Sequence, residues 1–146
     1  MIRKLVEENR TFRKFDPLRK VTYQEFIELV EVARLCPSST NNQTLRFAFA
    51  DKEKADIIFN NIKWAILIKD GTPSLKQRPT AYVLVLNDND YGKPDYTSAG
   101  IAIQSMLLRA VEMGLRGCIF GSIDRENLHR SLALGKNTEI LNVIAL

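Results

Sequence analysis

The sequence is poor in the residues that build metal sites and disulfide frameworks. Its 146 residues include two cysteines, Cys36 and Cys118, and a single histidine, His129. Two cysteines so far apart match no metal-ligand spacing and no disulfide pattern, and one histidine cannot form a zinc site by itself. We therefore expect no metal site and a reduced, cytoplasmic protein in which His129 lies on a helix surface.

Other common patterns are missing too. The N-terminus lacks the apolar stretch of a signal peptide, and no window approaches the length of a membrane-spanning helix. The formal net charge is +4, but lysine and arginine form no long tract, so charge alone does not indicate nucleic acid. The sequence contains no paired-carboxylate, GxSxG, CxxC or HExxH motif. Catalysis, if present, would depend on a bound cofactor.

Hydrophobic periodicity predicts a single domain over residues 1–146 in which helices separate the strands. Thr22 and Glu25 form the pattern of a capping box at the start of the second helix. The helix over 95–114 has apolar residues on more than one face, so it should be central and largely buried. The pattern indicates an α+β or α/β layered domain, with helices over 1–9, 21–36, 52–67, 95–114 and 124–134 and strands over 46–51, 81–88, 117–122 and 139–146.

A basic motif near the N-terminus could bind phosphate. "NRTFRKFD" places Arg10, Thr11 and Arg13 within four residues. Two guanidiniums and a hydroxyl in one turn can hold a phosphate through charge-assisted hydrogen bonds. The alternative is a solvated basic turn anchored by its two phenylalanines.

Two further segments could contact a ligand. "CPSSTNNQTLRF" offers small hydroxyl and amide groups that could line a planar heterocycle, although such residues also end helices and cap new ones. "GLRGCIFGS" ends in Gly121 and Ser122, which could present backbone N–H groups to a ligand. Tight packing explains these glycines equally well. Their spacing excludes a P-loop and a dinucleotide-binding fingerprint.

In this order, the segments resemble the nitroreductase family of FMN-dependent oxidoreductases. The resemblance spans essentially the whole chain and rests on "RTFRKF", "CPSSTNNQTLRF", "RPTAYVLVL", "DYTSAGIAIQSMLLRAVEMGLRGC" and "IFGSID". It implies an α+β fold of three layers, in which helices flank a mainly antiparallel sheet. It also implies a homodimer with FMN at the subunit interface, formed largely by the helix from Tyr96 to Met113.

The resemblance also implies roles for individual residues. Arg10, Thr11 and Arg13 would hold the FMN phosphate and ribityl chain. Gly121 and Ser122 would lie beside flavin N5. The loop residues that would reach the isoalloxazine ring, usually from the partner subunit, are Pro37, Ser38, Ser39 and Asn41, with Gln43 nearby.

The implied reaction is ping-pong transfer of hydride from NADH or NADPH through flavin N5 to a small acceptor such as a nitroaromatic or a quinone. No side chain would act as acid or base. Related members with dehalogenase or dehydrogenase chemistry, a non-catalytic FMN-binding or sensing protein of the same fold, and a nucleic-acid-binding domain are the alternatives.

Three features depart from the family pattern. Thr44 and Leu45 replace the usual Pro-Trp pair, and Thr11 replaces the usual serine. Family members usually continue past the final strand into a basic segment, whereas this sequence ends at Leu146. The resemblance therefore implies a compact member without that C-terminal segment, so the contribution that the segment makes to FMN affinity and dimer stability in the family is not expected from this sequence.

Overall fold

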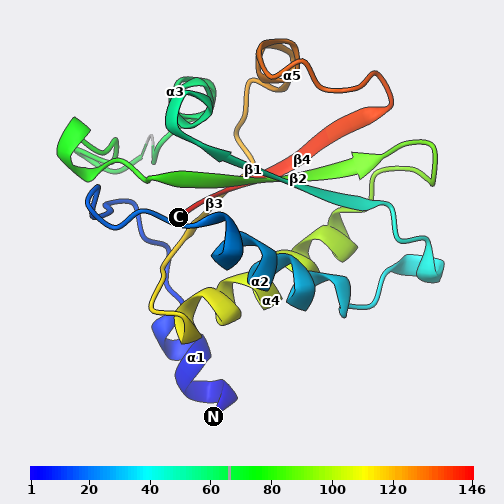
Figure 1. Ribbon diagram of the computed structural model, residues 1–146, viewed down its shortest axis with the longest axis horizontal. Coiled ribbons are helices and arrows are strands. Elements are labelled where there is room, and N and C mark those ends of the chain that lie inside the picture. Colours follow the sequence, from blue (N-terminus) through cyan, green and yellow to red (C-terminus); the bar gives the residue numbers. More distant parts are fainter. Residues whose placement is uncertain (66) are drawn as a thin grey trace.

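The computed structural model describes residues 1–65 and 67–146. Within these residues, four strands and five α-helices form three layers, and short 3-10 helices span Ser39–Asn41 and Leu75–Gln77 (Figure 1). The helices are α1 (Ile2–Glu8), α2 (Tyr23–Arg34), α3 (Lys52–Asn61), α4 (Tyr96–Glu112) and α5 (Arg125–Ser131). The strands are β1 (Leu45–Asp51), β2 (Ala81–Asp88), β3 (Cys118–Phe120) and β4 (Thr138–Ala145). None of the described helices is long and apolar enough to cross a membrane.

The sheet is antiparallel and has the strand order β1-β2-β4-β3. The central strand β2 is buried from Ala81 to Asn87, as its continuous apolar run predicts for a strand covered on both faces. Strands β1 and β3 form the two edges. The start of β1 and the end of β3, where candidate site residues lie, are therefore at opposite edges of the sheet.

Helices cover both faces of the sheet and enclose two hydrophobic cores. In Figure 1, α2 and α4 lie below the sheet, and α3 and α5 lie above it. Because side chains alternate along a strand, Val83 and Val85 face the α2–α4 layer, whereas Tyr82 and Leu84 face the α3–α5 layer. This arrangement confirms the three-layer α+β fold that the resemblance implies.

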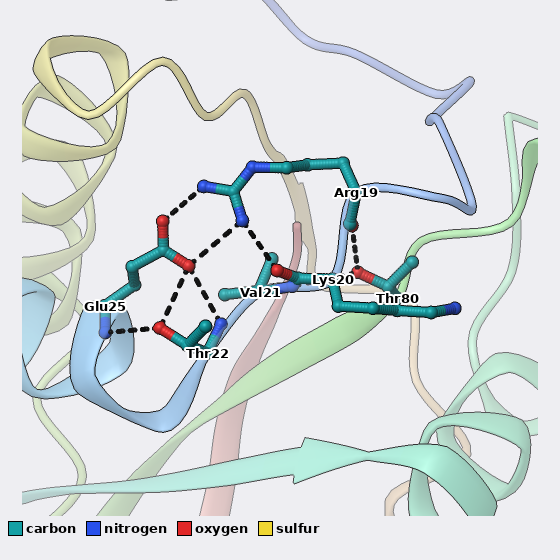
Figure 2. Close-up of polar contacts among 6 residues, drawn as sticks. All are labelled: Arg19, Lys20, Val21, Thr22, Glu25 and Thr80. Carbon is teal, nitrogen blue, oxygen red and sulfur yellow. Dashed lines mark hydrogen bonds and ion pairs between the residues drawn. The ribbon is translucent and has the colours of Figure 1, made fainter.

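The predicted capping box forms and joins the start of α2 to the sheet (Figure 2). The Thr22 hydroxyl accepts a hydrogen bond from the Glu25 amide at 3.2 Å, and the Thr22 amide donates to Glu25 Oε2 at 2.8 Å. The Arg19 guanidinium pairs with the same carboxylate. Thr80, just before β2, donates its hydroxyl to the Arg19 carbonyl at 2.8 Å. The arginine and the caps hold the pKa of Glu25 below its usual value.

Two predictions about local structure were wrong. The helix expected over 52–67 ends at Asn61, because Ile62 becomes extended and forms an antiparallel bridge with Ile123. The part of that prediction at residue 66 lies outside the described residues. His129 is half-buried rather than a free surface residue, since its Nε2 lies 3.1 Å from the Gly135 carbonyl and 2.9 Å from the Thr138 carbonyl.

Candidate functional site

The basic motif lies in an extended segment fixed by its backbone. The Phe12 amide donates to the Gly117 carbonyl at 3.1 Å, and the Phe15 amide donates to the Gln77 carbonyl at 2.9 Å. Arg10 and Thr11 are exposed. They line a hollow of about 140 Å³ whose other walls come from the residue after α1, from α4, and from β3 and the residue before it, namely Asn9, Gln104, Leu107, Gly117 and Ile119. The segment is held by main-chain bonds, which leaves its polar side chains available.

Arg10 and Arg13 differ from the other arginines of the protein. Among the residues that the structure describes, every other arginine bonds to a carboxylate or a backbone carbonyl. Neither Arg10 nor Arg13 has such a partner within the described chain, although Arg13 is half-buried. Two guanidiniums without a carboxylate, in one short segment, form a site with unbalanced positive charge that suits an anion.

Gly117, whose carbonyl accepts from the Phe12 amide, lies close to α4 and β4. A methyl group on Gly117 would lie 2.6 Å from Leu107 Cδ2 and 3.0 Å from the Ala145 carbonyl oxygen. The adjacent Cys118 thiol is buried, which raises its pKa, and the positive charge of Arg13 partly opposes that rise. The motif therefore packs closely against the start of β3.

The segment after β3 is supported on one side and open on the other. The Ser122 carbonyl accepts from the Lys63 amide at 3.0 Å, and the Asp124 amide donates to the Asn61 carbonyl at 2.8 Å. Gly121 and Ser122 are both exposed. A methyl group on Gly121 would meet nothing nearer than Asn142 Nδ2 at 3.9 Å, and the backbone of Gly121 does not adopt a positive φ. Within the described chain, neither packing nor conformation requires a glycine at this position.

The loop from Pro37 to Gln43 is held by its own hydrogen bonds. The Gln43 amide donates to the Ser38 hydroxyl at 3.1 Å, and Gln43 Nε2 donates to Asn41 Oδ1 at 2.9 Å. The Asn41 amide donates to the Ser38 carbonyl at 3.0 Å. These bonds occupy some of the hydroxyl and amide groups that the sequence predicts to contact a ligand. The side chains of Ser39 and Asn41 remain exposed.

Beside this loop lies an amphipathic cavity of about 330 Å³. Pro37, Ser38 and Gln43 contribute to its wall. The remaining walls come from the end of α2, from Cys36, from β1 and from the first turns of α4, namely Val30, Ala33, Arg34, Leu45, Arg46, Phe47, Ser98 and Ala102. Thr44, at the end of the loop, is buried, and its hydroxyl has no hydrogen-bond partner among the described residues.

The structure thus groups the candidate residues into two sets that one chain does not bring together. Arg10, Thr11, Arg13, Gly121 and Ser122 lie at the β3 edge, whereas the loop Pro37–Gln43 precedes β1 at the opposite edge. Three inter-strand spacings separate those edges, about 14 Å across the sheet. Helix α4 connects the two sets, because Ser98 and Ala102 line the loop cavity and Gln104 and Leu107 line the hollow beside Arg10.

Sequence reasoning missed a third hollow, of about 530 Å³, between Lys14 and the segment that follows α3. Trp64 forms part of its wall and is buried, and the indole Nε1 has no partner among the described residues. The sequence pattern predicts a helix through Trp64, which conceals this hollow, so only the neighbouring basic motif could have pointed to it. Within residues 1–65 and 67–146, no cluster of His, Cys, Asp and Glu side chains could hold a metal ion.

The model of the nitroreductase family matches residues 6–146. The chain belongs to the nitroreductase family. No curated protein matches this nitroreductase-family chain.

Solved structures share the fold at low sequence identity. A Desulfovibrio desulfuricans protein described as a nitroreductase, solved in complex with FMN, is 24% identical, with a TM-score of 0.81 over 99% of this chain and 83% of that one. An FMN-dependent nitroreductase from Clostridium difficile R20291 is 20% identical, with a TM-score of 0.78 over 99% of this chain and 85% of that one. The FMN- and NADPH-dependent nitroreductase NfnB from Sphigopyxis sp. strain HMH is 15% identical, with a TM-score of 0.77 over 99% of this chain and 86% of that one.

Proposed function

We propose that this nitroreductase-family protein is an FMN-dependent oxidoreductase that works as a homodimer. NADH or NADPH would be the electron donor, and a small oxidised molecule such as a nitroaromatic or a quinone would be the acceptor. Membership of the family supports the cofactor and the reaction class. NfnB, which has the same fold, is both FMN- and NADPH-dependent, which supports a nicotinamide donor.

The observation that carries this proposal is the unpaired charge of Arg10 and Arg13. All other arginines of the described chain are bonded within the protein, so these two are available for an external anion. A phosphate group accepts several charge-assisted hydrogen bonds, and the adjacent Thr11 hydroxyl could donate another. The side chains at this edge therefore fit the phosphate end of FMN.

Gly121 and Ser122 fit the ring end of the same ligand. The packing around Gly121 leaves room for a side chain, so its absence is best explained by a group that approaches the backbone from outside. A backbone N–H at this position could donate to a ring nitrogen. Its support by the 61–63 segment would hold that donor in place without a charged side chain.

A second copy of the chain would complete the site. The Pro37–Gln43 loop lies at the edge opposite to Arg10, so it would contact the flavin bound by the partner. The surface between them carries exposed apolar groups, with Ile101 on α4 40% exposed and Ile119 on β3 45% exposed. Gly100, next to Ile101, has open space around it, so α4 could approach another helix closely there. These features support a dimer interface along α4.

Bound FMN would supply the two-electron chemistry that the side chains of this protein lack. The protein would bind the phosphate through Arg10, Thr11 and Arg13, and would orient the ring through Gly121 and the partner's loop. The apolar walls of the loop cavity would exclude water from the ring. The free thiols Cys36 and Cys118 are compatible with the reducing cytoplasm, and we propose neither a membrane nor a nucleic-acid partner.

Spectroscopy of the purified protein tests this proposal. We expect FMN absorbance in the protein as isolated, or its recovery after FMN is added. Anaerobic NADH or NADPH should then bleach the flavin band, and a nitroaromatic or a quinone should restore it. Protein that binds no FMN would contradict the proposal. Bound FMN without turnover by either nicotinamide would instead favour a non-catalytic flavin-binding protein.

A further inference from the structure

The loop between α2 and β1 has a strained backbone. Thr40, Asn41 and Gln43 adopt φ values of 49°, 55° and 52°. Non-glycine residues rarely occupy this left-handed region, and a β-branched residue such as Thr40 is especially unfavourable there. Such strain persists only where surrounding contacts fix the conformation, and it is often found where a ligand binds.

A polar pair at the start of α4 provides one of these contacts. The Ser39 amide donates to the Ser98 hydroxyl at 3.0 Å, and that hydroxyl donates to Asp95 Oδ2. The other carboxylate oxygen of Asp95 caps α4, accepting from the Thr97 and Ser98 amides at 3.0 Å each. Ser98 is only 2% exposed, so its hydroxyl is shielded from water. The loop is thus attached to the start of α4 immediately before the strained residues.

We propose that Asp95 and Ser98 are positioning residues that hold the Pro37–Gln43 loop in its flavin-binding conformation. This inference rests on the proposed function. Asp95 fixes Ser98 as the acceptor for the Ser39 amide, and that bond maintains the left-handed turn at Thr40. The free-energy cost of the left-handed loop backbone would then be met during folding, so FMN binding would not require the loop to become ordered.

This arrangement also changes the role expected for Ser39. Its amide is already bonded to Ser98, so only its exposed side chain would remain for the ligand. The backbone of Ser39 acts instead as the attachment point of the loop. Ser98 lies in the wall of the neighbouring cavity, which places the attachment beside the proposed ring site.

The test combines Ser98→Ala with a change that relieves the strain. In the FMN-free protein, Ser98→Ala should speed hydrogen exchange of the Ser39 amide by about tenfold, because the amide loses its shielded acceptor. FMN should bind about tenfold more weakly, as measured by quenching of flavin fluorescence. Adding Thr40→Gly should recover about threefold of that loss, because glycine adopts a positive φ without support. Asp95→Asn, which keeps the helix cap, should weaken FMN binding by about threefold.

Thr22→Ala is the matched control, since it removes a helix-cap hydroxyl at the far end of α2 (Figure 2). It should lower the unfolding midpoint while leaving Ser39 exchange and FMN affinity unchanged. The inference is overturned if Ser98→Ala binds FMN normally, if Thr22→Ala weakens binding equally, or if Thr40→Gly restores nothing. Wild-type protein that binds no FMN overturns the proposed function as well, so the two failures are distinguishable.

Discussion

The two halves of the candidate site differ in whether their polar side chains are hydrogen-bonded within the protein. At the β1 edge, Ser38, Asn41 and Gln43 bond to one another, and Ser39 bonds to Ser98 on α4. At the β3 edge, the backbone of Phe12 is fixed, but the guanidiniums of Arg10 and Arg13 have no carboxylate or carbonyl partner in the described chain. One half is a neutral, preorganised loop, and the other is a fixed backbone with free charge.

This difference matches two kinds of recognition. Unpaired arginines attract an anion and contribute strongly to affinity, because their hydrogen bonds are charge-assisted. A rigid neutral loop contributes mainly shape and orientation, since its internal bonds are retained when a ligand binds. We therefore expect the loss of the free charge at the β3 edge to lower affinity most, and changes that affect the loop or the dimer to act less strongly.

Removing both free guanidiniums should have the largest effect. Each charge-assisted hydrogen bond contributes about 1.5–3 kcal/mol, so Arg10→Ala with Arg13→Ala should weaken FMN binding at least about 100-fold. Fluorescence titration measures this loss. Arg3→Ala, which removes an arginine that is highly exposed and paired with Glu7, is the control and should bind FMN as the wild type does. Equal affinity in the double variant would show that the free charge serves another purpose.

Changing the exposed face of α4 tests whether the two halves meet across a dimer. Ile101→Arg should shift the sedimenting species from a dimer towards a monomer. It should also weaken FMN binding about tenfold, because the partner's loop would no longer contact the flavin. The matched control is Leu18→Arg, at an apolar residue that is 87% exposed in the linker before α2. A wild-type monomer that binds FMN tightly would contradict the dimer, and the loop would then need another role.

Much of the fold was predictable, because local patterns determine it. The strand β2 and the capping box of α2 match their predicted residues, since a buried apolar run and a Thr-x-x-Glu spacing have few other solutions. The end of α3 was not predictable. The apolar residues Ile62 and Trp64 continue a pattern that fits a helix, yet they are buried in an extended segment, a consequence of tertiary packing.

The candidate site was predictable in its residue types but not in its arrangement. The sequence indicates Arg10 and Arg13 as anion ligands, but it cannot show that all other arginines are bonded elsewhere. It also cannot show that Ser98, which lies in an apolar helix, accepts the Ser39 amide, because that contact spans distant parts of the chain. Pairings of this kind depend on the packed structure.

Gly121 offers a narrower test of the β3 edge. Gly121→Ala should leave the free energy of unfolding within about 0.5 kcal/mol of the wild-type value, since the nearest described atom to the added methyl group is Asn142 Nδ2 at 3.9 Å. FMN affinity should nevertheless fall about tenfold, because the methyl group would occupy space needed by the ring. Gly135→Ala, on the loop between α5 and β4, is a comparable change away from the site, and it should leave affinity unaltered. If the Gly121→Ala protein binds FMN as tightly as the wild type, the flavin ring does not lie against Gly121.

The smallest effect should come from Glu25, at the far end of the helix that leads to the loop. Arg19 and the Thr22 groups lower the folded-state pKa of Glu25 below its ordinary value of 4.5, against the opposing effect of burial. A lowered pKa means that the carboxylate adds stability above that ordinary value and loses its contribution as the pH falls through the folded-state pKa. Glu25→Gln should therefore lower the free energy of unfolding by about 1 kcal/mol at pH 7 and by less at pH 3.

Urea unfolding at several pH values measures this difference. Glu126→Gln, which removes a highly exposed helix ion pair with Arg130, should change stability little at any pH. FMN affinity decides what the result means for the site. If Glu25→Gln lowers stability and leaves FMN binding intact, the loop depends on its attachment to α4 at Ser98. If binding falls together with stability, the loop also depends on α2, and its preorganisation is a property of the whole helical layer.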